Sequence, residues 1–171
     1  MALELSGLIL GESSDILYTH SSEEVAEATF VLADQARHSL DIFTQHLDQR
    51  LYNSVALYDA VLKLATRSRH SLVRILIQDS MPAAKNSNRL VELSYRISSR
   101  LQIRIPPVEH EEFREELVIA DGCGLLRRIN PNRYEGELCF NAAIKARQLK
   151  SFFDECWQHS AADPQLRRLH I

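Results

Sequence analysis

The amino-acid sequence predicts an α/β fold, in which a mixed β-sheet is flanked by helices on both faces. Two observations lead to this prediction. Of the 171 residues, 45% are hydrophobic and 25% are charged, which is typical of a globular chain with a sizeable core. Short apolar runs alternate with segments whose apolar residues recur at helical spacing, and a strand pair and a long helix follow them.

The first elements are an N-terminal lead and a helix. The run Ser21-Ser22-Glu23-Glu24 is typical of a capped helix start, and apolar residues then recur at helical spacing in a helix that should end near Arg37. Residues 39–44 alternate as a strand does. Asn53 is suited to cap a second helix. The apolar positions of that helix are Val55, Tyr58, Val61, Leu62 and Ala65.

The rest of the chain contains further strands and two helices. The strands expected here are residues 72–77, 101–105, 116–120, 124–128 and 137–140. A helix is expected from about Lys85 to Arg100. The pair of strands around Asp121-Gly122 should form a hairpin. The last helix should dock on the sheet through one broad face with Trp157 at its edge, made of Ala142, Ala146, Leu149, Phe152, Phe153 and Cys156.

The net charge, the cysteines and the lack of long apolar runs exclude several classes of protein. The net charge of −3 argues against attachment to nucleic acid or membrane by bulk charge, because such proteins usually carry a basic excess. Cys123, Cys139 and Cys156 are odd in number and widely spaced, which indicates reduced core thiols. No run approaches the roughly 18 apolar residues of a membrane span, and no signal peptide is recognisable. We therefore expect a cytoplasmic protein that does not bind membranes.

From residue 72 onward, the order of elements resembles a domain of the phospholipase D family. A strand that ends in Asp79, a helix, a strand closed by two prolines and the run 116–122 follow one another as in such a domain. Glu137 before a short strand, and the apolar face of the last helix, are similar to the segment after the catalytic motif of that family. The resemblance covers roughly residues 39 to 160. It implies a single phospholipase D-like domain over residues 1–171, with 1–38 as N-terminal lead and helix, in a bacterial branch.

The catalytic motif of that family, His-x-Lys-x-x-x-x-Asp, is missing from this sequence. In the family, one His attacks phosphorus, a second His protonates the leaving oxygen, Lys holds the phosphate and Asp orients the His. Aligned on Asp121, the His position is Arg114 and the Lys position is Glu116. An arginine stays protonated near pH 7 and cannot serve as nucleophile or general acid. The resemblance therefore implies a degenerate site without catalytic residues, with Glu116 and Asp121 as remnants of the motif.

Three arginines near this motif are candidate anion-binding residues. The guanidinium fork of Arg114 suits phosphate geometry, although an ion pair with Glu111 or Glu112 would also account for this residue. Arg127 and Arg128 lie where the resemblance implies that residues close over the phosphate. Because consecutive residues of a strand point to opposite faces, only one of the two should line the pocket.

Four basic residues on the helix expected over 85–100 form a stripe beside its apolar face, which we call the basic stripe: Lys85, Arg89, Arg96 and Arg100. Such a stripe could follow a nucleic-acid backbone or hold an acidic partner. It could equally be a solvated face, with Glu92 and Arg96 paired along the helix.

Five glutamates form an acidic run from residue 109 to residue 116. Carboxylates in such a run can hold a metal ion, but in the approach to a strand they are usually only solvated. His110 lies within the run, and nothing near it in sequence supplies a nucleophile or an orienting partner. We therefore expect no metal and no other cofactor.

These observations favour a non-catalytic binding or assembly module, which retains affinity for a phosphate-containing ligand in the former active-site cleft. One alternative is a phosphodiesterase or nuclease that uses His110 or another histidine in an unorthodox site. Another is a nucleic-acid-binding regulator that uses the basic stripe. A histidine in the cleft near Arg114 and Asp121 would favour the enzyme, and converging arginine donors would favour binding. The resemblance further implies a homodimer, since single-motif members of the family pair across their active sites.

Overall fold

One mixed β-sheet organises the chain. The computed structural model describes residues 3–166, and the strands of its sheet lie in the order β1-β7-β6-β5-β2-β3-β4-β8. In chain order they are β1 Leu17–Thr19, β2 Ser39–Thr44, β3 Leu72–Ile77, β4 Leu101–Ile105, β5 Glu116–Ala120, β6 Gly124–Arg128, β7 Gly136–Cys139 and β8 Ala161–Ala162. Strands β2, β3 and β4 are parallel, and the other neighbouring pairs are antiparallel.

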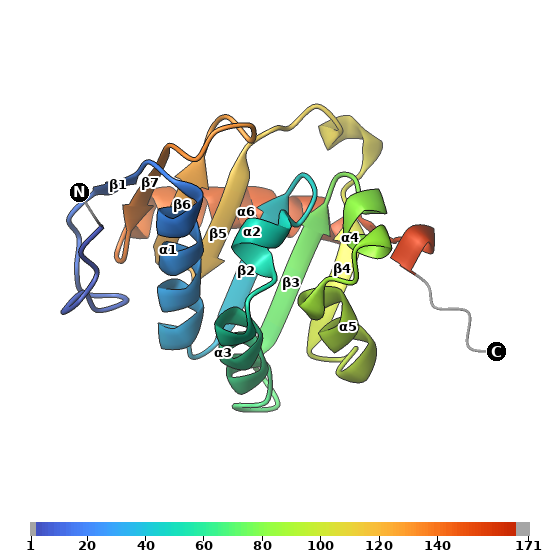
Figure 1. The fold of residues 1–171 in the computed structure, drawn as a ribbon, viewed down its shortest axis with the longest axis horizontal. Coiled ribbons are helices and arrows are strands. Elements are labelled where there is room, and N and C mark those ends of the chain that lie inside the picture. Colours follow the sequence, from blue (N-terminus) through green and yellow to red (C-terminus); the bar gives the residue numbers. More distant parts are fainter. Residues whose placement is uncertain (1–2, 167–171) are drawn as a thin grey trace.

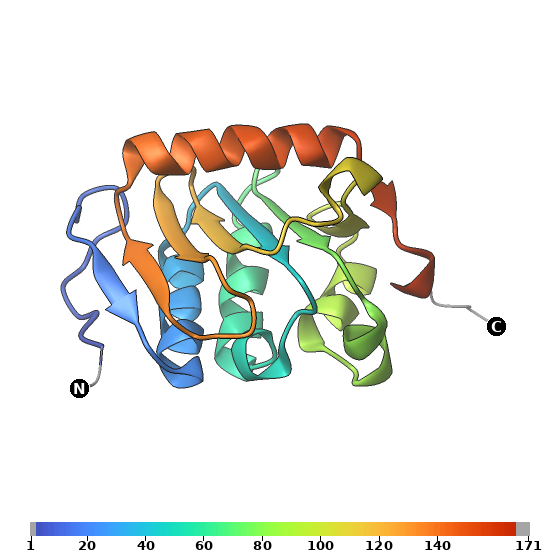
Figure 2. The ribbon, with the colours of Figure 1, turned by 90° about the horizontal axis from the view of Figure 1, so that it is seen from above.

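Helices cover both faces of this sheet, as the sequence predicts (Figure 1). They are α1 Ser22–Gln35, α2 Gln49–Tyr52, α3 Val55–Ala65, α4 Met81–Lys85, α5 Arg89–Arg96 and α6 Ala143–Gln158, with short 3-10 turns at Val108–His110 and Pro164–Leu166. Figure 2 shows α6 lying across one face, while α1, α3 and α5 lie side by side on the other. Within residues 3–166, no helix is long and apolar enough to cross a membrane.

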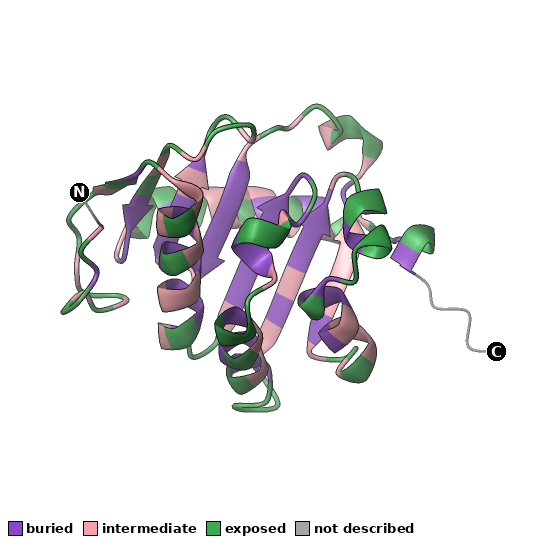
Figure 3. Ribbon diagram, in the orientation of Figure 1, coloured by how far each residue is buried: buried purple, intermediate pink, exposed green. Residues whose placement is uncertain are grey.

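The apolar core lies in two layers, one on each face of the sheet, and the central strands between these layers are mostly buried (Figure 3). The larger layer packs the sheet against α1, α3 and α5. The smaller one, under α6, contains Phe43, Leu76, Leu117, Phe153 and Cys156. β2 is buried along almost its whole length, because it is a central strand covered on both faces.

The predicted docking of α6 is confirmed at its centre. Phe153 is fully buried, and Trp157 is partly buried beside it with the two rings stacked. The guanidinium of Arg74, on β3, lies over the Phe153 ring and donates hydrogen bonds to Asp41 and to Asp154 of α6. The helix is therefore held to the sheet by apolar contact and by a charge network.

The predicted cap of the first helix is confirmed, and that of the second is wrong. The Ser21 side chain accepts a hydrogen bond from the Glu24 amide and begins α1. Ser54, rather than Asn53, caps α3 by accepting from the Leu57 amide. The Asn53 side chain accepts instead from the Arg89 amide, at the start of α5.

The single helix expected from Lys85 to Arg100 is also wrong, because the structure divides this segment. α4 ends at Lys85, and Ser87 adopts a left-handed backbone conformation with φ 55°. Asn88 then caps α5 through its side-chain oxygen, which accepts from the Leu90 amide at 2.8 Å. An asparagine side chain that bonds to nearby amides competes with helix continuation, which explains the break.

Candidate anion-binding cleft

The sheet reverses its strand order at β2, whose carboxyl end lies beside that of β3. From β2 the chain builds β3 and β4 on one side and then returns to place β5 on the other. In open α/β sheets, ligands bind in the crevice outside such a switch point. The segments that follow β2 and β3, the loop before β5 and the loop after β6 all meet at this edge.

A hollow of about 410 Å³ opens at this edge, and we call it the cleft. Its lining residues are Gln45, His46, Gln78, Asp79, Glu111, Arg114, Pro131 and Asn132. Amides, two acids, one arginine and one histidine therefore converge from four separate segments of the chain.

Arg114 is the candidate anion-binding residue that lines the cleft. Its Nη1 donates to the side-chain oxygen of Gln45 and to the backbone oxygen of Glu111, each at 3.0 Å. Among the described residues, its Nε and Nη2 donors have no hydrogen-bond partner, and the side chain is exposed. A guanidinium held on one nitrogen and free on the others can offer its fork to an anion.

Two glutamines fix the loop that carries Arg114. The side-chain amide of Gln45 donates to the Phe113 carbonyl at 3.2 Å, and that of Gln78 donates to the His110 carbonyl at 2.8 Å. Because both glutamines directly follow their strands, the ends of β2 and β3 position this loop. Arg114 is thus placed by the sheet itself.

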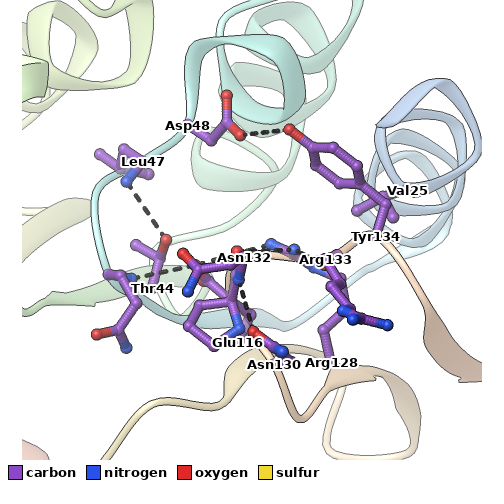
Figure 4. A network of polar contacts seen from close by, with 12 residues as sticks. Val25, Thr44, Leu47, Asp48, Glu116, Arg128, Asn130, Asn132, Arg133 and Tyr134 are labelled. Carbon is purple, nitrogen blue, oxygen red and sulfur yellow. Dashed lines mark hydrogen bonds and ion pairs between the residues drawn. The ribbon is translucent and has the colours of Figure 1, made fainter. Parts of the chain in front are cut away.

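Glu116, at the position the resemblance assigns to the phosphate-holding Lys, is buried and paired with Arg128 (Figure 4). Their side chains are 6% and 3% exposed, and Oε1 of Glu116 lies 3.7 Å from Nη2 of Arg128. The same oxygen accepts a hydrogen bond from the backbone amide of Gln45 at 3.2 Å. Burial raises the pKa of Glu116, while the Thr44 hydroxyl and the Arg128 charge partly oppose that rise. The Arg128 guanidinium is therefore engaged inside the protein.

The loop after β6 is organised around Arg128. Its Nη1 donates to the Arg133 carbonyl at 2.6 Å, and its guanidinium faces the ring of Tyr134. The Tyr134 hydroxyl donates to Asp48 at 3.0 Å (Figure 4). These contacts hold the loop so that Asn132 lines the cleft.

Arg127 lies on the opposite face of β6. It forms a two-pronged pair with Glu115, with nitrogen to oxygen distances of 3.0 and 2.7 Å. It lines a separate hollow of about 350 Å³, beside Tyr18 and Ile129. Of the three candidate arginines, the structure thus brings only Arg114 to the cleft.

Asp121 stands at the far end of β5 from Arg114. Its carboxylate accepts from the backbone amides of Arg37, His38 and Ser39 at 2.8–3.1 Å. With φ values of 53° and 69°, Asp121 and Gly122 form the predicted hairpin turn. In this position, Asp121 secures the junction of α1 and β2 and does not orient a cleft residue.

His46 and Asp79 are cleft residues that the sequence reasoning missed. His46 Nδ1 lies 3.9 Å from Asp79 Oδ2, and both side chains are more than half exposed. Their positions directly after β2 and β3 were the available signal, because parallel strands end at a common edge. His110 lies elsewhere, with its ring against Phe152 in a different hollow.

The arginines of the basic stripe contact α3 and the segment around it. Arg89 donates to the Asn53 carbonyl, Arg96 to the Tyr58 hydroxyl, and Arg100 to the carbonyls of Ala65 and Ser68. Lys85 is exposed at the end of α4. The stripe is therefore divided among α4, α5 and the turn that follows α5, and it is partly used to join α5 to α3.

The remaining candidate groups add no site. The acidic run is split, since Glu115 pairs with Arg127 and Glu116 with Arg128. Within residues 3–166, no cluster of three or more His, Cys, Asp or Glu is arranged to hold a metal ion. All three cysteines are free thiols, and burial raises the pKa of Cys123 and that of Cys156, the latter to about 11.

This sheet, with a single long helix on one face and a cleft at its switch point, defines a protein with a phospholipase D-like fold. More particularly, the chain belongs to the family described as Domain of unknown function (DUF7931), whose model matches residues 21–169. No curated protein matched the sequence.

Solved structures support the fold assignment. TrmBL2, an archaeal chromatin protein described as having a novel mode of DNA binding, superposes with a TM-score of 0.64 at 13% identity, over 88% of this chain and 54% of its own. This chain thus spans about half the length of TrmBL2. Nuc from Salmonella typhimurium, a phospholipase D family member, gives 0.58 at 13% identity over 86% of this chain and 96% of its own. NucT from Helicobacter pylori gives 0.58 at 11% identity, over 87% and 100%.

Proposed function

We propose that this chain binds a phosphate-like anion in the cleft through Arg114, and that it does not hydrolyse phosphodiesters by the phospholipase D mechanism. The observation that carries the proposal is that the acid next to the cleft is neutralised inside the protein, whereas an arginine remains available in the cleft. Glu116, at the expected place of the phosphate-holding Lys, is withdrawn into an ion pair with Arg128, whereas Arg114 keeps donors open to the cleft.

The chemistry of the cleft supports binding more than turnover. Arg114 cannot replace the nucleophilic His of the family, because a guanidinium stays protonated. Glu116 is buried in an ion pair with Arg128, away from a ligand in the cleft. Asp121 is committed to backbone amides. The site is accordingly a degenerate one, whose remaining cation serves recognition.

Phosphates of nucleic acids are one source of such an anion. TrmBL2 is described as binding DNA, and its fold is similar to that of this chain. The basic stripe is a weaker route to nucleic acid, since its arginines already donate to groups of α3 and of the segments that flank it. We therefore place the anion in the cleft rather than on α5.

Calorimetric titration with inorganic sulfate tests the proposal. The wild type should bind sulfate at low salt, and Arg114→Gln should weaken binding about tenfold or more, the effect of one charge-assisted hydrogen bond. Arg67→Gln is the matched control, because Arg67 is exposed at the opposite edge of the sheet after α3. Equal sulfate affinity in Arg114→Gln and Arg67→Gln would show that Arg114 does not bind the anion.

A homodimer is a further part of the proposal, supported by the resemblance to single-motif phospholipase D proteins. Ile129, 68% exposed, and Tyr18, 55% exposed, supply apolar surface beside the loop that lines the cleft. Sedimentation equilibrium should give twice the chain mass of 19.6 kDa. Ile129→Glu should shift the equilibrium towards the single chain, and a wild type that sediments as one chain would reject the dimer.

A further inference from the structure

We infer that His46 is the second cationic ligand of the anion and that its protonation sets the strength of binding. This inference rests on the anion site proposed above and deepens it. Arg114 supplies a permanent charge from the loop before β5, and His46 supplies a second, conditional charge from the end of β2. Together they select doubly charged anions of the phosphate and sulfate type.

The position of His46 fits this role. It directly follows Gln45, whose side chain bonds to Arg114, and both His46 and Arg114 line the cleft. Its Nδ1 faces Asp79 at 3.9 Å, which leaves Nε2 as the nitrogen available to a ligand. The imidazole is 56% exposed, so an anion can reach it without a rearrangement of the core.

The charges around His46 come from three further segments. Asp79 follows β3, Glu111 and Arg114 belong to the loop before β5, and the buried Glu116 of β5 interacts electrostatically with His46. Arg128 balances Glu116 from β6. With a neutral imidazole, the lining of the cleft therefore carries two exposed acids against one arginine.

Because of this charge balance, the charge of the imidazole determines how strongly the cleft binds a dianion. A cleft with one cation and two acids attracts a dianion weakly, because the acids oppose the guanidinium. Protonation of His46 brings the lining to two cations and two acids and adds a second N–H donor. An affinity that depends on the charge of this imidazole should therefore depend on pH.

Sulfate is the suitable probe, because its charge is constant over the pH range of the titration, whereas that of phosphate is not. We expect the affinity of the wild type for sulfate to fall about tenfold between about pH 5.5 and about pH 8, the effect of one charge-assisted hydrogen bond. His46→Gln should bind sulfate weakly throughout, with little dependence on pH. His46→Lys should bind at both pH values, because its charge persists.

The control is His70→Gln, which removes an exposed histidine from the segment between α3 and β3. It should retain the pH dependence of the wild type. The same pH dependence in His46→Gln as in the wild type would overturn the role of His46 while leaving the Arg114 site intact. Absence of sulfate binding by the wild type at every pH would overturn the site itself and this inference with it.

Discussion

Glu116 and Arg128 form an ion pair in which both side chains are almost completely buried. Both residues have further contacts, since Oε1 of Glu116 accepts from the backbone amide of Gln45 and Arg128 donates to the Arg133 carbonyl. Oε2 of Glu116 is buried without a hydrogen-bond partner among the described residues. A buried ion pair is weak support for stability in itself, because desolvation offsets the attraction. Its consequence lies in the cleft, where Arg128 is no longer available to an anion.

Replacement of Glu116 by Gln should expose the cost of burying that carboxylate. Burial raises the pKa of Glu116 above its ordinary value of 4.5, so the folded chain holds the proton more tightly than the unfolded chain. The contribution is fully present below 4.5 and is lost as the pH rises through the raised pKa. The wild type should therefore lose stability relative to Glu116→Gln as the pH rises from about 4 to about 7.

Urea denaturation of both proteins across this range measures the difference in their free energies of unfolding. Glu27→Gln, at an exposed position of α1, corrects for the general loss of a glutamate. A difference that moves in the opposite direction, with the wild type gaining on the Gln variant as pH rises, would mean that Arg128 lowers the pKa of Glu116 more than burial raises it.

At the scale of elements, the strands were the most predictable part of this chain. The runs at 39–44 and 72–77 combine apolar content with clear ends, and both strands have these bounds in the structure. The break between α4 and α5 was missed because the apolar positions from Leu90 onward predicted one helix, and the polar residues 85–89 before them fit its first turn. The Asn88 cap depends on local bonds that apolar spacing does not reveal. The short edge strands β1 and β8 were missed because two or three residues carry no period.

Phe153 is the apolar centre of α6, and its truncation should destabilise the protein by about 3–5 kcal/mol through lost burial and a residual cavity. The side chain is fully buried against Phe43 and Trp157, and the Arg74 guanidinium lies over its ring. Thermal and chemical denaturation of Phe153→Ala measures the loss.

Ile144→Ala is the matched control on the same helix, because Ile144 is 77% exposed. It should change the free energy of unfolding by about 0.5 kcal/mol or less. A loss below about 1 kcal/mol for Phe153→Ala would contradict the docking of α6, since it is smaller than any well-packed Phe truncation.

At the scale of the whole molecule, sequence reasoning reached the fold class but only one residue of the cleft. Arg114 was found because the family motif points to its position. His46, Gln78, Asp79 and Asn132 come from segments that are distant in sequence and meet only at the edge of the folded sheet. Strand alternation was enough to predict that Arg127 and Arg128 point to opposite faces of the sheet. The burial of Arg128 could not be predicted, because it depends on the loop that folds over this side chain.

The fold of the whole molecule is shared with Nuc, NucT and an archaeal chromatin protein at only 11–13% identity. The sheet order and the layer of helices fix where a cleft forms, while the residues that line it vary. In this chain, the lining joins one guanidinium, bonded through Nη1 alone, and one imidazole to two exposed acids.

The most direct test of an anion site in the cleft is a sulfate titration of the isotopically labelled protein, followed by nuclear magnetic resonance of its backbone amides. At about pH 6, shifts that saturate should cluster on the segments containing residues 45–46, 78–79, 111–114 and 131–132. In Arg114→Gln, these shifts should require about tenfold or more sulfate to saturate. Saturable shifts confined to α4 and α5, or to the hollow beside Tyr18, would contradict the account, as would the absence of any saturable shift.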